Sequence, residues 1–569
     1  MASSGDLVRK EYKDFRGVDF NDGEIVASRS PFSLNMWKNY KENARCVETR
    51  PDIELKETYD NVIYGMFFYT KSDTLHKIVH CGTKLYDNSE QIFVGMNIAK
   101  SQYFVFNEIL YIKDGINYLK YDGTEVKSVE GTIPITSTGK SPSGAGTTYQ
   151  DVNLLTGVRK NSFVADGTST VYQLDTDNLD TNYTVTAVVN DITIVEGMGL
   201  TVDRTAGKVT FSTAPAEPIT TGQDNVVITF SKTIQGYRDR ILKCTLLTEF
   251  DNRIFFSGNQ NYPNVVFHSS LEDPEYVSDL DYYNEGLDVS PVKSMVAGNN
   301  ALWVFKEPSQ TNTTIYYHNP VIDNTYGKIY PSTHSSISTG CVATGINFND
   351  DICFFSDRGM EGISSDVTTE QVLSHRSSMI DSKLLSEINY KDMILEEWEG
   401  YLLVFIGKHV YLADSRQKYQ DISIEYEWYY WELPYEVTCT RVKDGVLYLG
   451  MNNQIYTLTK TDSNISSVWR LPKEDFNAPQ LLKTTNKRGG TAVCDGEITV
   501  KVKKDNDDYI TIDTYEESKG YIVYRIKQKK FKDLQIEFSS NIPMKLYSCT
   551  IEAFVGGYVT IGGNYGSKL

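Results

Sequence analysis

The stretch that decides the fold is Val446-Leu-Tyr-Leu-Gly-Met-Asn-Asn-Gln-Ile-Tyr456. It consists of an apolar run, a short polar turn and a second run that carries Ile and Tyr. Apolar runs on either side of a short turn of this chemistry are typical of a β-hairpin. The same unit is present at Lys77-Ile-Val-His-Cys-Gly-Thr-Lys-Leu-Tyr86 and at Ile109-Leu-Tyr-Ile-Lys-Asp-Gly-Ile-Asn-Tyr118.

The unit repeats along the chain at a nearly constant spacing. Further copies begin near Arg253, Ala301, Asp351 and Tyr401, and successive starts lie about 32, 144, 48, 50, 50 and 45 residues apart. A period of about 40–50 residues with paired hairpins is typical of β-propeller blades. We therefore predict an all-β fold built on a β-propeller of six to eight blades. An irregular multi-sheet protein in which hairpins recur by chance is the alternative.

The one long gap contains a segment of different character, residues 134–232. Its first part, 138–148, is rich in Gly, Ser and Thr, a composition typical of a flexible linker. About five short strand-like runs follow, among them Tyr183-Thr-Val-Thr-Ala-Val-Val189 and Val226-Val-Ile-Thr-Phe230. We predict a small inserted β-sandwich, because insertion at an exposed loop is well tolerated.

The character changes again after about Leu471. Runs such as Ile498-Thr-Val-Lys-Val502 and Leu534-Gln-Ile-Glu-Phe538 are short and largely alternating, which predicts a C-terminal β-domain. Helix is scarce, and the best candidate is Met379 to Leu395. The predicted domains are an N-terminal arm with the first propeller blades (1–133), the inserted β-sandwich (134–232), the remaining blades (233–470) and the C-terminal β-domain (471–569).

Charge and composition restrict the class of protein. The formal net charge is −19, which argues against a surface that binds nucleic acid through clustered Lys and Arg. An acidic wall would still suit a conduit through which DNA slides without sticking. Solubility alone is the simpler explanation of the charge.

Cysteine usage and hydropathy indicate where the protein is made. The eight cysteines form no C-x-x-C pair, and several lie in apolar runs, so we expect free, buried thiols and a reducing site of synthesis. The stretch Met1 to Asp6 has no apolar signal core, and no run approaches the ~20 apolar residues of a membrane span. We expect synthesis in a cytoplasm and no membrane span.

A search for phosphate-binding and metal-binding motifs gives weak candidates. Gly139-Lys140-Ser141 has the ending of a phosphate-binding loop, but Pro134 stands where its first Gly belongs. Gly144-Ala-Gly146 is better explained as linker than as a dinucleotide fingerprint. His76 and His80 share one face of a predicted strand about 13 Å apart, a spacing that favours ordinary sheet histidines over a zinc site.

Candidates for catalysis or stacking are equally weak. Glu396-Glu-Trp-Glu399 suggests a solvated acidic turn more than a catalytic carboxylate. Ser356-Asp-Arg-Gly-Met360 lacks the spacing and the Trp of sialidase turns and is typical of a hairpin turn. The run Tyr426-Glu-Trp-Tyr-Tyr-Trp431 could stack sugars or bases, but packing between blades or at a subunit interface is favoured. We predict no catalytic, cofactor-binding or metal-binding residues, no cofactor and no enzyme activity.

Several segments, in order, resemble one family. The N-terminal ones are Phe15-Arg-Gly-Val-Asp19, Ser30-Pro-Phe-Ser-Leu-Asn-Met36 and Arg50-Pro51, where Asp52 replaces the family's following Gly. The central one runs from Asn252-Arg-Ile-Phe-Phe-Ser-Gly-Asn259 through Tyr262-Pro-Asn-Val-Val-Phe-His-Ser269 to Asp273-Pro-Glu-Tyr276. Later ones are Leu302–Glu307, Asp357-Arg-Gly359 through Ile363, Arg376-Ser377 with Ile380-Asp381, and Tyr426–Trp431.

Together these segments resemble the propeller-containing tail proteins of bacteriophages, called nozzle, tail-hub or tail-stabilisation proteins. The resemblance covers most of the chain except the insertion. It implies a virion component assembled as a homo-oligomeric ring, a hexamer in the nozzle type, which lines a DNA-ejection channel and contacts portal, adaptor or other tail proteins. DNA would pass through it without sequence-specific binding. A host-surface-binding propeller of adhesin or lectin type at the tail tip is the main alternative, and a depolymerising enzyme is a second.

Overall fold

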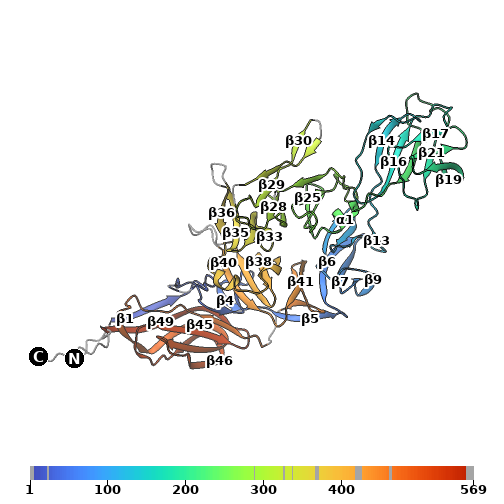
Figure 1. Ribbon diagram of the computed structural model, residues 1–569. Coiled ribbons are helices and arrows are strands. Elements are labelled where there is room, and N and C mark those ends of the chain that lie inside the picture. The colour runs from blue at the N-terminus through green and yellow to red at the C-terminus, as the bar shows by residue number, and fades with distance from the viewer. Residues whose placement is uncertain are drawn as a thin grey trace. The chain divides into compact units, whose positions relative to one another are not determined.

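The computed structural model is built almost entirely from β-strands (Figure 1). Helix in the described residues is limited to α1 (Tyr237–Leu242), α2 (Asp381–Leu384) and the 3₁₀ turn η1 (Tyr390–Asp392). The all-β prediction is therefore confirmed. The structure describes residues 6–21, 23, 25–287, 289–324, 327–335, 338–365, 371–416, 426–459 and 464–558. Met1 to Gly5, for which we predicted no signal core, lie outside the described residues.

Six four-stranded sheets and one run of four strands within a larger sheet form seven groups of propeller-blade type in the described residues. The number of blades around a ring stays a prediction. The first four are β6 (Ile63–Lys71), β7 (Thr74–Cys81), β8 (Lys84–Asp87) and β9 (Glu90–Val94); β10 (Gln102–Phe106), β11 (Ile109–Lys113), β12 (Tyr118–Tyr121) and β13 (Val126–Ser128); β23 (Leu246–Phe250), β24 (Arg253–Ser257), β25 (Val265–His268) and β26 (Tyr282–Asn284); and β27 (Val292–Gly298), β28 (Ala301–Lys306), β29 (Ile315–His318) and β32 (Ser332–His334). The other three are β33 (Gly345–Phe348), β34 (Asp351–Ser356), β35 (Gly359–Ser365) and β36 (Gln371–His375); β37 (Ile394–Trp398), β38 (Tyr401–Ile406), β39 (His409–Asp414) and β40 (Glu427–Glu432); and β41 (Val437–Lys443), β42 (Val446–Met451), β43 (Gln454–Thr459) and β5 (Asp52–Thr58).

The repeat in the sequence corresponds to the second and third strands of each group. Six of the seven copies begin directly after a two-residue turn whose residues both have positive φ, and in the first the strand β7 begins after such a turn, three residues before Lys77. Such type I′ turns match the twist of the strands they join and favour Asn, Asp and Gly. The turns are Ser72-Asp73, Asn107-Glu108, Asp251-Asn252, Asn299-Asn300, Asn349-Asp350, Glu399-Gly400 and Asp444-Gly445.

One group takes its fourth strand from a distant part of the chain. Strand β5 pairs antiparallel with β43, with Asp52 opposite Thr459 and Thr58 opposite Gln454. Nearly 400 residues separate the two strands in the sequence. The group is therefore completed only when the N-terminal region meets the end of the repeat array.

The segment between β13 and α1 forms a nine-stranded sheet with its own core. The sheet curls over buried side chains that include Phe163, Tyr172, Phe211 and Ile228. The Gly- and Ser-rich stretch expected as a flexible linker is instead part of this sheet, because 138–148 contains a strand end, a turn and a short strand. In sheet order the strands are β15 (Thr147–Thr148), β14 (Ile135–Lys140), β16 (Val158–Phe163), β22 (Val226–Ser231), β18 (Thr186–Val189), β19 (Ile192–Glu196), β20 (Gly199–Asp203), β21 (Lys208–Phe211) and β17 (Val171–Gln173).

The C-terminal region is a set of long strands that share one sheet and one core with N-terminal strands. Side chains from both ends of the chain, such as Tyr12, Met36 and Phe538, lie in this core. The strands are β1 (Asp6–Tyr12), β2 (Ser33–Leu34), β3 (Met36–Asn39), β4 (Asn43–Thr49), β44 (Ser467–Arg470), β45 (Leu481–Lys504), β46 (Ile510–Tyr524), β47 (Lys529–Phe531), β48 (Leu534–Ser540) and β49 (Lys545–Tyr558).

The helix predicted from Met379 to Leu395 is wrong. The segment holds only the single turns α2 and η1, and β37 begins within it at Ile394. Ile394 and Leu395 pair with Phe405 and Val404 of β38, so sheet formation prevails over the mixed helical periodicity.

The chain divides into two compact units, residues 1–66 with 348–569 (unit 1) and residues 67–347 (unit 2). No helix in the described residues is long and apolar enough to cross a membrane.

Candidate functional site

The N-terminal segment of unit 1 lies against strand β40 and is fixed there by backbone hydrogen bonds. Val18 N donates to Trp428 O at 2.8 Å, and Asn35 N donates to Tyr430 O at 3.0 Å. Gly17 has φ +83°, and a Cβ at this position would lie 2.3 Å from Trp428 O. Only glycine fits this close approach, because it lacks the Cβ and tolerates positive φ. We call the contact between residues 15–51 and β40, with its immediate neighbours, the N-terminal junction.

A buried arginine links the two ends of this junction. Arg50 Nε donates to Asn35 Oδ1 at 3.0 Å, and Arg50 Nη2 donates to Glu432 O at 3.2 Å. The same Asn35 oxygen accepts from Glu432 N at 2.9 Å. Burial lowers the pKa of Arg50 to about 10, and the charge of Asp52 only partly opposes this shift. These bonds fix the Arg50-Pro51 step directly before β5.

A buried carboxylate forms the second link. Glu427 on β40 has a side chain that is 1% exposed, and it accepts from Arg16 Nε at 2.8 Å. Lys38 Nζ lies 3.8 Å from its other oxygen. Burial raises the pKa of Glu427, while Lys38 and Arg16 oppose this shift. Two cations from the N-terminal segment therefore compensate one carboxylate of the strand.

The far side of β40 meets the end of β36. Trp428 Nε1 donates to Arg376 O at 2.8 Å, and the Arg376 guanidinium donates to Asp351 at 2.9 Å. Ser377 Oγ donates to Asp381 Oδ1 at 2.6 Å and accepts from Met360 N at 2.7 Å. These contacts anchor the α2 turn to the hairpin between β34 and β35.

The segments that carry the family resemblance in unit 1 therefore converge on one network. They are separated by up to about 400 residues in the sequence, yet each of them contributes a hydrogen bond or ion pair to the junction. The residue types are needed for specific contacts: Gly for close approach, Arg and Glu for a buried pair, and Trp for a donor to a buried carbonyl.

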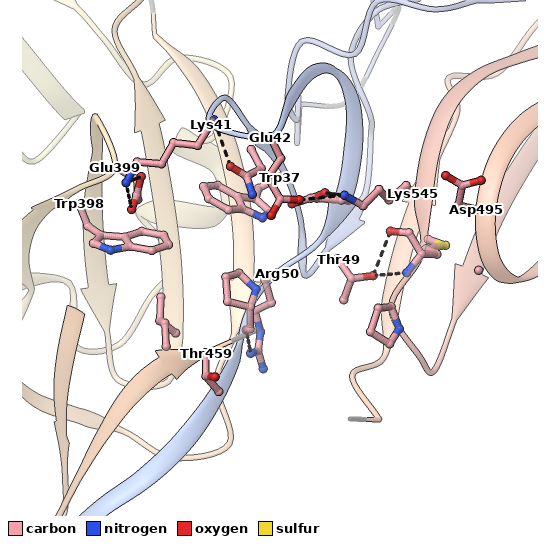
Figure 2. A pocket seen from close by; sticks show the side chains of 17 residues that line it. Trp37, Lys41, Glu42, Thr49, Arg50, Trp398, Glu399, Thr459, Asp495 and Lys545 are labelled. Carbon is pink, nitrogen blue, oxygen red and sulfur yellow. Dashed lines mark hydrogen bonds and ion pairs between the residues drawn. The ribbon is translucent and has the colours of Figure 1, made fainter. Parts of the chain in front are cut away.

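A cavity of about 460 Å³ opens beside the junction (Figure 2). Trp37 and Trp398 lie on one side of it, with ring centroids 5.5 Å apart, while Lys545 and Asp495 lie on the opposite side. Lys41 Nζ pairs with Glu399 at 2.5 Å. An aromatic wall with charged groups at its edge is a common form of binding pocket.

The charged groups of this cavity are mostly satisfied within the protein. Lys545 Nζ bridges Glu48 at 2.6 Å and Glu42 at 3.1 Å, and these two carboxylates raise its pKa. Trp37 is 2% exposed and packs on Trp398 and Trp431, so its ring faces are covered. The arrangement holds β4, β37 and β49 together and offers no open aromatic face to a ligand.

The two histidines considered for metal binding are ordinary sheet residues. They lie on β7 as predicted, and His76 Nδ1 contacts Asp87 Oδ2 at 2.5 Å. His80 hydrogen-bonds Ser101 Oγ and Gly82 O, each at 3.0 Å, and burial lowers its pKa. No group of three or more His, Cys, Asp or Glu able to hold a metal is found in the part of the chain that the structure describes.

The other weak candidates also have structural roles. Glu396 and Glu397 lie on β37 and only Glu399 lies in a turn, so the predicted turn is wrong for the first two, although Glu397 is exposed. Burial raises the pKa of Glu396 and of Glu397. The hairpin turn at Ser356–Met360 is confirmed by the pairing of Ser356 with Gly359.

The aromatic run and the cysteines behave as predicted. Residues 427–431 lie in β40 and are buried, which confirms the packing interpretation of Tyr426–Trp431 over stacking of an external base or sugar. All eight cysteines are buried and free.

The central segment of the resemblance forms a hairpin in unit 2. Gly258-Asn259 directly follows β24. The Asn259 side chain donates to Asp239 O at 3.1 Å and to Arg240 O at 2.9 Å, near the end of α1. Asn259 is 1% exposed. Sequence reasoning noted the Gly-Asn pair as a turn but not as the partner of a helix, because α1 was not predicted.

No protein-family model and no curated protein matches this chain. Among solved structures, BamB from Moraxella catarrhalis is 9% identical, covers 72% of this chain and 98% of its own, and has a TM-score of 0.31. The computationally designed Ika8 protein is 9% identical, covers 71% and 98%, and has a TM-score of 0.30. An exo-β-1,3-galactanase from Phanerochaete chrysosporium is 7% identical, covers 93% and 100%, and has a TM-score of 0.20. At these identities and TM-scores, the chain is not assigned to the family of any of the three proteins, and no activity is inferred from them.

Proposed function

We propose that this protein is a non-catalytic structural subunit of a tailed bacteriophage particle, a ring-forming nozzle or hub protein that lines the DNA-ejection channel. The observation that carries the proposal is the N-terminal junction. The segments of unit 1 that resemble the tail-protein family, from residues 15–51 and from 376–431, contribute bonds to one buried network. Chance similarity of short segments would not require them to meet.

The chemistry of the junction supports a mechanical role. Its charged groups are used in internal ion pairs, as in Arg16–Glu427 and Arg376–Asp351, and its aromatic residues are buried. A ring subunit through which DNA passes needs rigidity and weak attraction to phosphate. The net charge of −19 is consistent with the second requirement.

The first experiment is electron microscopy of the purified full-length protein, with particles classified by symmetry. Closed rings with an open central channel, six-fold in the nozzle type, are expected. Monomers, or trimers without a channel, would contradict the ring and favour the host-surface-binding alternative, which glycan-array binding would then test. Immunogold labelling of intact virions provides an independent test, because the proposal requires the label at the tail.

A further inference from the structure

A second hollow, of about 540 Å³, lies in unit 2 where the inserted sheet meets the loop around Asp279. Two cationic side chains line it, Lys140 at the end of β14 and Arg159 on β16. Lys140 is 5% exposed and Arg159 is 6% exposed. Lysine and arginine are almost never this buried unless they are paired. Their partners therefore decide what the hollow can bind.

Among the described residues the Lys140 ammonium faces an aromatic ring and has no carboxylate within ion-pair distance. Its Nζ lies 5.7 Å from the centre of the Phe163 ring, and it forms no hydrogen bond or ion pair with the residues that the structure describes. Burial lowers the pKa of Lys140, and the field of Asp175 only partly opposes this. The turn that follows packs closely on the side chain, since a Cβ at Gly146 would lie 2.4 Å from Lys140 Cγ. The ammonium group is thus held in place at the hollow.

Arg159 uses little of its hydrogen-bonding capacity. Nη2 donates to Lys232 O at 3.2 Å, while Nε is buried without a partner among the described residues. A guanidinium has five N–H donors, and a buried donor without a partner destabilises the folded protein. Nη1 forms no hydrogen bond with the described residues and is not fully buried, so it is the donor left for an acceptor that enters the hollow.

Acidic side chains lie at the same hollow and act on Lys140 and Arg159 through their field, but they form no ion pair with either cation among the described residues. Asp175 Oδ2 accepts from Thr136 Oγ1, and Asp151 Oδ2 accepts from Ser278 Oγ at 3.3 Å. Asp279 accepts from Tyr237, and burial raises its pKa. No ion pair joins these carboxylates to Lys140 or Arg159 within the described residues. The hollow therefore offers unused cationic donors together with carboxylate acceptors.

We propose that this hollow binds a polyol that carries an oxyanion, such as a sugar acid or a sugar phosphate. The oxyanion lies between the Lys140 ammonium and the Arg159 guanidinium, a pairing that gives short, charge-assisted hydrogen bonds. Hydroxyl groups of the same ligand donate to Asp175 and Asp151. A neutral sugar would leave the two cations without an acceptor, and a simple anion would leave the carboxylates without donors.

The pocket also explains the sequence Gly139-Lys140-Ser141, which lacks the features of a nucleotide-binding loop. No long helix follows it, so no helix N-terminus faces an anion. The lysine instead ends a strand and is covered by the turn 141–146. Its charge thus faces a site built by the inserted sheet. The proposed ring and this site are independent, since the junction lies in unit 1.

Isothermal titration of the full-length protein with D-glucuronate, D-glucose 6-phosphate, D-glucose and inorganic phosphate tests the proposal. The first two probes distinguish a carboxylate from a phosphate, and at least one of them is expected to bind tenfold or more tightly than glucose and than inorganic phosphate. Equal binding of inorganic phosphate would overturn the polyol part. Equal binding of glucose would overturn the oxyanion part, and lack of binding by both acidic probes would overturn the site.

Two variants locate the binding. Lys140→Met keeps the length of the side chain and removes the charge, and a loss of affinity of tenfold or more is expected. Arg159→Lys keeps the charge and removes the forked donors, with a smaller loss expected. Lys160→Met, on the same strand but outside the hollow, is the matched control and is expected to bind like the unchanged protein. Binding unchanged by Lys140→Met in a protein with an unaltered circular dichroism spectrum would overturn the proposal.

Discussion

The guanidinium of Arg16 donates to the buried carboxylate of Glu427 at 2.8 Å, across 411 residues of sequence. Removing one partner of such a pair leaves a buried charge without compensation, which is costly. We expect Arg16→Met to lower the free energy of unfolding of unit 1 by about 2–4 kcal/mol. Urea unfolding followed by tryptophan fluorescence measures this, because five of the six Trp residues lie in unit 1.

Arg9→Met is the control for this change, because Arg9 is an exposed residue of β1. A substitution at such a surface position is expected to stay within about 0.5 kcal/mol of the unchanged protein. Equal stability of the two variants would show that the Arg16–Glu427 pair does not hold the junction.

Gly17→Ala tests the close approach of the N-terminal segment to β40. The new Cβ would lie 2.3 Å from Trp428 O at φ +83°, so we expect a loss of more than about 2 kcal/mol in unfolding free energy. Gly236→Ala is matched in backbone, since Gly236 also has φ +83° but no atom within 4 Å of its Cβ position. It is expected to cost only the strain of positive φ, about 1 kcal/mol. Similar losses in thermal unfolding of the two variants would exclude the steric contact.

His375 gives unit 1 a pH-dependent stability. Its Nε2 lies 2.5 Å from Asp381 and its Nδ1 lies 3.1 Å from Glu361, and hydrogen bonds to these carboxylates raise the pKa of His375 to about 10. The folded state therefore binds the proton more tightly than the unfolded state. The stabilisation is fully present below pH ~6.5, the unfolded pKa of histidine, and is lost as the pH rises toward 10.

The measurement is the difference in unfolding free energy between the unchanged protein and His375→Gln from pH 6 to 10. The difference is expected to shrink as the pH rises. The comparison with the variant is needed because other groups also make the unfolding free energy depend on pH. Burial lowers the pKa of Lys113, in unit 2, to about 8, and this shift makes the unfolding free energy rise with pH, opposite to the effect of His375. A constant difference across this range would contradict the assignment.

Asn259→Ala tests the link between α1 and the β24 hairpin. The change removes the donors to Asp239 O and Arg240 O, and we expect a loss of about 1–3 kcal/mol. Faster amide hydrogen exchange across residues 237–244 would identify the site of the loss. Asn312→Ala, in an exposed loop, is the control, and equal exchange in both variants would contradict the link.

The hairpin repeat was predictable because each hairpin is made by residues adjacent in the chain. Turn chemistry and alternation are local properties, so the seven starts from Lys77 to Val446 were located from sequence. The turn pairs before each start, such as Asn299-Asn300, were a second local signal that sequence reasoning did not use. The helix predicted near Met379 failed because pairing of Ile394 and Leu395 with β38 outweighs a weak local preference.

By itself the sequence determined the all-β class, the period of the hairpins, the buried free cysteines and the structural role of the aromatic run near Trp428. Only the tertiary structure decided that β5 pairs with β43, that Gly17 meets Trp428 and that Lys140 and Arg159 share a hollow. The physical reason is the range of the interactions. Hairpins satisfy their hydrogen bonds within a few residues, whereas these contacts join distant segments whose partners are specified only by the folded chain.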